Sequence, residues 1–190
     1  MKKFLFPIIS ILVACLLAAG ATALALKYSG KGKITIGPWQ TNVETGSGKA
    51  GAYLRAWVAL NAPWALNSSE VLYFLAYEDS QGQTLDCNCV YKIEGTEPDT
   101  RWWSIAAYED LHFIPNPINR YSLNVSTVET DNNYTFAIYL APEAKYINWL
   151  PSCQNGGQLA LCLRCYGPSD AFRANIAKAE LPTITKISCR

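Results

Sequence analysis

This chain of 190 residues contains one histidine and one methionine, and it has almost no excess of charge of either sign. His112 is the only histidine, which excludes a metal site built from two histidines, including the H-E-x-x-H type of metalloprotease. The 16 Lys and Arg residues almost balance the 15 Asp and Glu residues, so there is no basic excess with which to bind nucleic acid. Hydrophobic residues make up 50% of the chain, a composition that excludes a disordered protein.

Charge is absent from the segment next to the N-terminus. Phe4 to Leu26 contains no charged side chain and follows Met1-Lys2-Lys3. As a helix with a rise of ~1.5 Å per residue, this segment would be roughly 34 Å long and could cross a bilayer. We expect residues 1–3 to form a short tail and residues 4–26 to form an uncleaved transmembrane anchor. Two alternatives stay open, a signal peptide cleaved at a site such as Ala19-Gly20-Ala21 and a lipoprotein signal that ends at Cys15.

Six cysteines follow this segment, and an even number in a small domain is typical of disulfide bonds formed in an oxidising compartment. We therefore expect the folded part to lie outside the cytoplasm. The C-x-x-C spacing near residue 162 resembles a redox site, but a strand would place its two thiols on opposite faces. A four-thiolate zinc site is the alternative to disulfides; we expect disulfides, no metal and no cofactor. The candidate disulfide cysteines, whose pairing the sequence leaves open, are Cys87, Cys89, Cys153, Cys162, Cys165 and Cys189.

Beyond the apolar segment, the pattern is mainly that of β-strands. Residues 27–48 are interpreted as a linker that runs into a first strand at Ile34–Ile36, and residues 49–190 as one extracytoplasmic domain. Ala50–Leu60 is the one clear helical stretch, because its apolar side chains recur with helical spacing.

Regular strands with turn signals between them determine the expected fold class. Val71–Tyr77 and Thr84–Ile93 flank a glycine-containing turn and predict a hairpin. The whole pattern predicts a mainly β protein, an antiparallel β-sandwich or jelly-roll-like domain with one short helix, preceded by a transmembrane helix. Further strands are expected over residues 102–108, 121–125, 134–140 and 158–166.

Several short segments, taken in order, identify a resemblance. They are Tyr53-Leu54-Arg55-Ala56, Cys89-Val90-Tyr91, Arg101-Trp102-Trp103-Ser104-Ile105 with Tyr108, Asn119-Arg120-Tyr121-Ser122, Asn148-Trp149-Leu150-Pro151, and Leu163-Arg164 with Tyr166. With these, residues from about Gly37 to Pro168 resemble the short, membrane-anchored branch of the bacterial domain of unknown function 1214 family. The resemblance implies a mainly β sandwich behind an N-terminal span, and a companion domain of unknown function 1254. It implies no established reaction.

Tryptophan, arginine and asparagine side chains in these segments are candidate ligand-binding groups. Aromatic rings beside planar polar groups suit neutral ligands with apolar faces, such as sugars or polyethers, because the rings stack while amides and guanidiniums bind the polar rim. The alternative is structural, with Trp in the core and Arg on loop carbonyls. The candidates are Arg101, Trp102, Trp103, Tyr108, Asn119, Arg120, Asn148, Trp149, Arg164 and Tyr166.

These observations together indicate a membrane-anchored extracytoplasmic binding or partner-docking module. We expect a single-pass protein of the inner (cytoplasmic) membrane with its domain on the periplasmic side. The alternative is a hydrolase-type enzyme acting on a neutral cell-envelope or small-molecule substrate, in which His112 pairs with Glu109 or Asp110. The chain has no G-x-S-x-G nucleophile motif, and we assign no catalytic residue.

Overall fold

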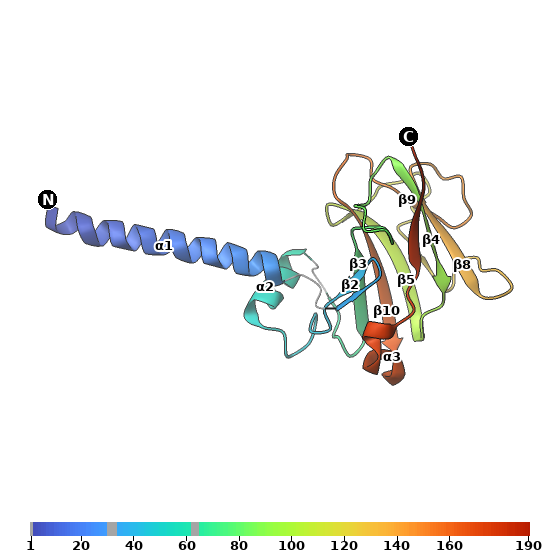
Figure 1. The fold of residues 1–190 in the computed structure, drawn as a ribbon, viewed down its shortest axis with the longest axis horizontal. Helices are drawn as coiled ribbons and strands as arrows, with labels where there is room; N and C mark the ends of the chain where they lie inside the picture. The colour runs from blue at the N-terminus through green and yellow to red at the C-terminus, as the bar shows by residue number, and fades with distance from the viewer. Residues whose placement is uncertain (1, 30–33, 62–64) are drawn as a thin grey trace.

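The computed structural model describes residues 2–29, 34–61 and 65–190, which form one long helix and a β-domain (Figure 1). Helix α1 runs from Lys2 to Ser29 and extends away from the β-domain. Its part Phe6–Ser29 is apolar and long enough to cross a membrane, and none of its most apolar window is buried against the protein. The helix is therefore a candidate membrane span whose apolar surface is left for lipid.

Seven strands form the larger sheet, in the order β1-β2-β3-β10-β5-β6, with β7 also paired to β5. All of these pairs are antiparallel, and β10 lies between β3 and β5 at the centre of the sheet. The strands are β1 (Ile34–Ile36), β2 (Trp39–Thr41), β3 (Val71–Ala76), β5 (Thr100–Glu109), β6 (His112–Phe113), β7 (Ser122–Asn124) and β10 (Leu159–Pro168).

Four strands form the smaller sheet, in the order β11-β4-β8-β9. The pairs β11–β4 and β4–β8 are antiparallel, whereas β9 runs parallel to β8. The strands are β4 (Cys89–Thr96), β8 (Thr135–Ala141), β9 (Trp149–Pro151) and β11 (Thr183–Cys189). Three short helical segments complete the described part of the chain: α2 (Ala52–Asn61), α3 (Asp170–Ala174) and the 3-10 turn Ile176–Lys178.

One hydrophobic core joins the two sheets. Alternate residues of each central strand point into it, among them Phe74, Ile105 and Leu161 from the larger sheet and Ile93 and Ile138 from the smaller sheet. Because both sheets bury one face against this core, the protein is a two-layer, mainly β fold, as the sequence predicts. The other face of the larger sheet points away from the core.

Two disulfides bind the smaller sheet together. Cys89–Cys189 joins the first residue of β4 to the last residue of β11. Cys87–Cys153 joins the segment before β4 to the segment after β9. Of the six expected partners, Cys162 and Cys165 are instead buried free thiols, because neighbouring positions on one strand project to opposite faces of the sheet.

The predicted hairpin does not form. Its two segments become β3 and β4, which lie in different sheets and share only an isolated bridge between Glu78 and Thr84. Both segments have apolar alternation because both face the same core, from opposite layers. The long connection between them, residues 77–88, spans the distance of about 10 Å that separates packed sheets.

The single predicted helix is present as α2, two residues later at its start. The expected strands at 34–36, 102–108, 121–125, 134–140 and 158–166 correspond to β1, β5, β7, β8 and β10. Strands β2, β6, β9 and β11 were not expected. Three of them are only two or three residues long, and β11 buries mainly Ile184, so none has a readable apolar alternation.

Candidate functional site

The candidate site is the outer sheet face, defined here as the surface of β3, β10 and β5 that points away from the core. Strand alternation sends Leu161 and Leu163 inward and therefore sends Arg164 and Tyr166 outward. The registers place Tyr73 and Ser104 on either side of Arg164. In the same way Tyr166 lies beside Trp102, so an arginine is surrounded by aromatic side chains from three strands.

Arg164 is the only arginine or lysine on the central strands of this face, and it is partly buried. Its guanidinium donates a hydrogen bond to the hydroxyl of Tyr108 and lies 5.7 Å from the centre of the Tyr108 ring. Among the described residues, no carboxylate forms an ion pair with Arg164. A cation removed in part from water without an anionic partner is an unusual arrangement, because desolvation of a charge costs free energy unless the charge is compensated.

Aromatic contacts extend from this arginine in two directions. Trp102 meets Tyr166 edge to face, with ring centres 5.0 Å apart. Tyr108 stacks on Phe113, with ring centres 4.9 Å apart, and Phe113 in turn meets Tyr121 at 5.4 Å. Burial raises the pKa of Tyr108 to about 12, so its phenol keeps its proton at neutral pH. The face thus offers flat apolar surfaces beside one fixed positive charge.

Three of the predicted site residues lie in structural positions instead. Trp103 is buried and stacks on Phe136, with ring centres 4.6 Å apart. Trp149 is buried and donates through Nε1 to the carbonyl of Ala141 at 2.8 Å. Their neighbours fill the space around them, so neither ring is available to a ligand.

Asn148 is also a structural residue. Its side-chain oxygen accepts from the N–H of Glu129 at 2.8 Å, and its amide nitrogen donates to the carbonyls of Glu129 and Ala137 at 2.7 and 3.1 Å. The two contacts with Glu129 connect the segment before β8 to the segment before β9, and the third connects that segment to β8 itself. The side chain has little remaining capacity for a ligand.

The last three candidates are not brought into the arginine-centred group. Arg101 is exposed near the start of β5 and lies against Gly167. Asn119 is exposed, with φ of +51°, in the connection between β6 and β7. Arg120 donates to the carbonyl of Ile147 at 2.8 Å. The candidates that the structure brings together are therefore Trp102, Tyr108, Arg164 and Tyr166.

Sequence reasoning missed Tyr73 of this face and two rings that adjoin it, those of Phe113 and Tyr121. The signal for Tyr73 was present, because it alternates with the core residues Leu72 and Phe74 and so must point outward. Phe113 and Tyr121 lie in or beside short elements, where no periodicity marks a face. Their places follow from the pairing of β6 and β7 with β5.

The two acidic residues that the hydrolase alternative would pair with His112 accept hydrogen bonds from a loop. Glu109 is buried, and its carboxylate accepts from the N–H groups of Gln154, Asn155 and Gly157 at 3.1, 2.8 and 2.9 Å. Burial opposes its charge, but these N–H groups together outweigh burial and hold the pKa of Glu109 below its usual value. Asp110 accepts from the N–H of Gln158 at 2.8 Å.

Neither acid is paired with the histidine. The ring of His112 is exposed, and its Nδ1 lies 2.7 Å from the backbone carbonyl of Asp110 rather than from a carboxylate. No acid–histidine pair is therefore formed within the described ranges.

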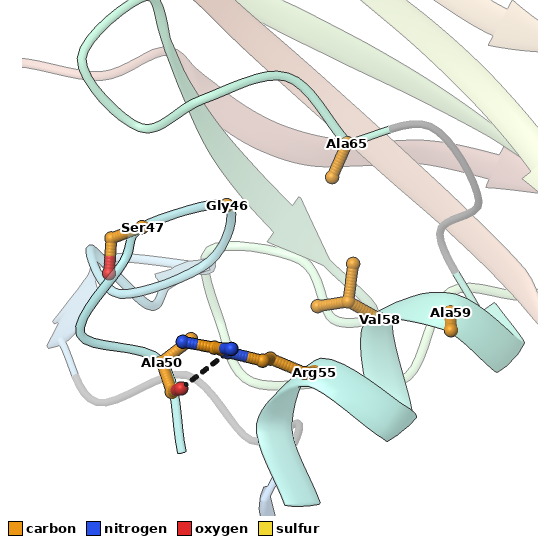
Figure 2. Close-up of a pocket in the computed structure, with 7 residues that line it drawn as sticks. All are labelled: Gly46, Ser47, Ala50, Arg55, Val58, Ala59 and Ala65. Carbon is orange, nitrogen blue, oxygen red and sulfur yellow. Dashed lines mark hydrogen bonds between the residues drawn. The ribbon is translucent and has the colours of Figure 1, made fainter. Parts of the chain in front are cut away.

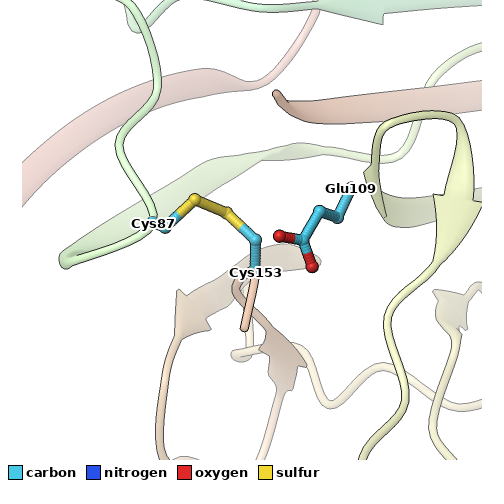
Figure 3. Close-up of side chains that lie close together, drawn as sticks. All are labelled: Cys87, Glu109 and Cys153. Carbon is cyan, nitrogen blue, oxygen red and sulfur yellow. A yellow bond between two sulfur atoms is a disulfide. The ribbon is translucent and has the colours of Figure 1, made fainter. Parts of the chain in front are cut away.

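Glu109 also lies beside the disulfide Cys87–Cys153 (Figure 3). One atom from each of the three side chains falls within 4.8 Å of the others, a spacing that could suit a metal ion. The two sulfur atoms are bonded to one another and are not thiolates, while the carboxylate oxygens already accept several N–H groups. The group is therefore best explained as a structural support for the 154–158 loop.

A cavity of about 300 Å³ lies between α2 and the segment that precedes it (Figure 2). Arg55 lines it and is fixed by hydrogen bonds to the carbonyls of Ala50 and Gly48 at 2.8 and 2.9 Å. A second hollow of about 320 Å³ lies beside Cys87 and Gly157. Neither cavity contains any of the predicted site residues except Cys87.

Comparison with known proteins yields a family and two solved structures. Residues 70–170 match the family described as protein of unknown function (DUF1214), and this range contains all ten candidate ligand-binding residues. No curated protein matches the chain. The VPA0106 protein from Vibrio parahaemolyticus is 25% identical with a TM-score of 0.59, over 74% of this chain and 36% of that one. An uncharacterized protein from Burkholderia cenocepacia is 13% identical with a TM-score of 0.46, over 91% of this chain and 42% of that one.

The present chain thus spans little more than a third of the length of the VPA0106 protein.

Proposed function

The chain belongs to the DUF1214 family of proteins of unknown function, and from this premise we propose that it is a membrane-anchored binding module. The outer sheet face would take a ligand that carries an anionic group on a flat apolar body. The two disulfides support an extracytoplasmic domain, since such bonds form in oxidising compartments. With α1 as the anchor, we place the domain on the periplasmic side of the inner membrane.

Arg164 is the residue on which this proposal depends. It projects from the central strand, is partly buried, and has no carboxylate partner among the described residues. A carboxylate or phosphate group of a ligand would supply that partner, because the planar guanidinium binds two oxygens at once. The Tyr108 phenol keeps the side chain oriented in advance, so less conformational entropy is lost when the ligand binds.

The surrounding rings favour a flat ligand body. Trp102 and Tyr166 form one aromatic pair and Tyr108 and Phe113 form another, with Arg164 between them along the sheet. Aromatic pairs contribute about 0.5–1.5 kcal/mol beyond the area that they bury. The neutral sugar or polyether suggested by the sequence would also stack on such rings, but it would leave the guanidinium without a counter-charge.

Two probes with the same ring system and different charge test this proposal. The full chain, kept in detergent without reductant, is titrated with naphthalene-2-carboxylate and with the neutral naphthalene-2-carboxamide by calorimetry. We expect the carboxylate to bind more tightly, and Arg164→Gln to weaken its binding by roughly 10- to 100-fold, as hydrogen bonds to charged groups predict. The carboxamide should bind the variant and the original protein alike.

Arg120→Gln is the matched control, because it removes the same charge from a guanidinium bound to the Ile147 carbonyl outside the candidate site. It should leave the binding of both probes unchanged. Equal losses in both variants would mean that net charge rather than this site attracts the carboxylate. Equal affinity of the two probes for the original protein would contradict an anion site and favour a neutral ligand, such as a sugar or polyether, instead.

Native mass spectrometry of the same preparation addresses the natural ligand. A small-molecule mass that is retained by the original protein and lost in Arg164→Gln would give the ligand class directly. A companion domain of unknown function 1254, implied by the resemblance, would present equivalent chemistry as an acidic side chain next to an apolar one. The hydrolase alternative has less support, because Glu109 and Asp110 accept backbone N–H groups and His112 faces a carbonyl.

A further inference from the structure

Helix α2 has the composition of a buried or membrane-bound helix, although much of its surface is exposed. Among its residues, Ala52–Asn61, the only charged one is Arg55. That charge is directed at the protein, since the guanidinium donates to the carbonyls of Ala50 and Gly48. A helix with apolar residues on every side is stable in a protein core or in lipid, but not in water.

The two sides of α2 have different surroundings. Arg55, Val58 and Ala59 line the cavity next to the preceding segment, as Figure 2 shows. The opposite side carries Tyr53, Ala56, Trp57 and Leu60, whose spacing of three or four residues aligns them along the helix. We call these four residues the outward stripe.

Three of the four residues of the outward stripe are exposed. Tyr53 is 49% exposed and Leu60 is 72% exposed, and Ala56 is exposed as well. Trp57 is partly exposed between them. By contrast Leu54, one position from Tyr53 in the sequence but on the inward side, is 5% exposed. The stripe is therefore an apolar and aromatic surface without a charged residue on it.

The place of α2 in the chain limits what can cover this surface. Helix α1 ends at Ser29, and the hydroxyl of Ser29 donates to the backbone carbonyl of Tyr53 at 3.1 Å. Figure 1 shows α2 next to the end of α1 nearest the β-domain. If α1 crosses the bilayer, its last turn lies at the boundary between lipid and water. The Ser29 contact then holds α2 at that same boundary, where tyrosine and tryptophan are enriched in membrane proteins.

We propose that α2 is an interfacial helix, whose outward stripe lies in the headgroup region of the bilayer that α1 spans. The occupant of this surface is the lipid of that same leaflet. An interfacial helix buries its apolar side at the boundary between headgroups and acyl chains and keeps its charged groups out of the lipid, as Arg55 on the opposite side of α2 does here. The helix would then fix the height and tilt of the β-domain above the membrane. This inference depends on α1 as a span and is independent of the ligand of the outer sheet face.

Quenching by brominated lipids tests the position of Trp57. The substitution Trp64→Phe is made in the full chain, which leaves Trp39 and Trp57 as the tryptophans between α1 and β3. This protein is placed in nanodiscs made with ordinary or with acyl-brominated phosphatidylcholine. We expect the brominated lipid to quench part of the tryptophan emission. Trp57→Phe should reduce that quenched part by about threefold or more, since bromine quenches only rings within or near the bilayer.

Trp102→Phe is the matched control, because Trp102 is also partly exposed but lies on the outer sheet face. It should leave the quenched part unchanged. As a second variant, Leu60→Lys should lower the quenching of Trp57, while the emission of the buried Trp103 and Trp149 reports whether the fold is retained. No lipid-dependent quenching, or equal quenching with and without Trp57, would overturn the proposal. If Trp57 is shielded from the quencher only when a copurified protein is present, the outward stripe is the binding surface of a protein partner instead.

Discussion

Removal of the Cys89–Cys189 disulfide should cost the domain a large part of its stability. The bond closes a loop with a sequence separation of 100 residues. In the chain-entropy treatment, a loop of that length restricts the unfolded state by about 4.7 kcal/mol at 25 °C. Single domains of this kind unfold with free energies of about 5–15 kcal/mol, so the double substitution Cys89→Ala with Cys189→Ala should remove a third or more of the total.

Urea unfolding of the full chain in detergent measures this loss. The emission of the buried tryptophans Trp39, Trp103 and Trp149 follows the β-domain. With a urea dependence of roughly 2 kcal/mol per molar, the midpoint should fall by about 2 M. Cys15→Ser changes an exposed cysteine of α1 and is the control that should leave the midpoint unchanged.

A midpoint shift below about 0.5 M would refute the reasoning, since an effect that small belongs to an ordinary surface substitution. The second bond provides an internal comparison. Cys87–Cys153 has a separation of 66 residues, for which the same treatment gives about 4.3 kcal/mol. The two loops overlap in sequence, so each bond closes a shorter effective loop while the other is intact, and the loss from removing both bonds should exceed the sum of the losses from removing each bond alone.

Three further predictions follow from the contacts described above. Denatured but unreduced protein should react with three equivalents of N-ethylmaleimide, at Cys15 and the two thiols of β10, and a mass with only one adduct would show that Cys162 and Cys165 are paired. Asn148→Ala should lower the free energy of unfolding by about 1–3 kcal/mol, because it leaves buried backbone groups without hydrogen-bond partners. The same variant should bind naphthalene-2-carboxylate as the original protein does. A loss of binding in calorimetry without a loss of stability would contradict the structural role of Asn148. The pKa of Glu109 is lower in the folded state than its unfolded value of about 4.3, so its carboxylate stabilises the fold above that pH and the stabilisation is lost as the pH falls through the folded value. Urea midpoints between pH 6 and pH 3 should therefore fall more steeply in the original protein than in Glu109→Gln, and parallel curves would show that the 154–158 loop does not depend on this charge.

Local pattern determined a large part of this fold before any tertiary information. The uncharged run at the N-terminus predicted α1 as a candidate span, because length and apolar composition are local properties. The strand expected over residues 158–166 is present as β10, whose leucines lie in the core while Arg164 and Tyr166 lie on the other face. The family resemblance was likewise carried by local segments, and the family match over residues 70–170 confirms it.

Local pattern misled where two segments meet the same core from different sides. An apolar alternation records that one face is buried, but not which layer buries it, so β3 and β4 were taken for a hairpin. The tryptophans show the same ambiguity. Trp102 and Trp103 are neighbours in sequence, yet one lies on the outer sheet face and the other stacks on Phe136 in the core.

The sequence by itself therefore determined the composition, the candidate span and the two faces of the main strands, because each depends on residues that are close along the chain. Tertiary structure alone decided the pairing of cysteines and the membership of the arginine-centred group, because both depend on strands distant in sequence. Cys89 meets Cys189, and Arg164 meets Tyr73 and Tyr108, only after β10 has been inserted between β3 and β5 and β11 has paired with β4. Such contacts form when two sheets pack over one core, and the spacing of residues within a single strand does not predict which strands will be neighbours.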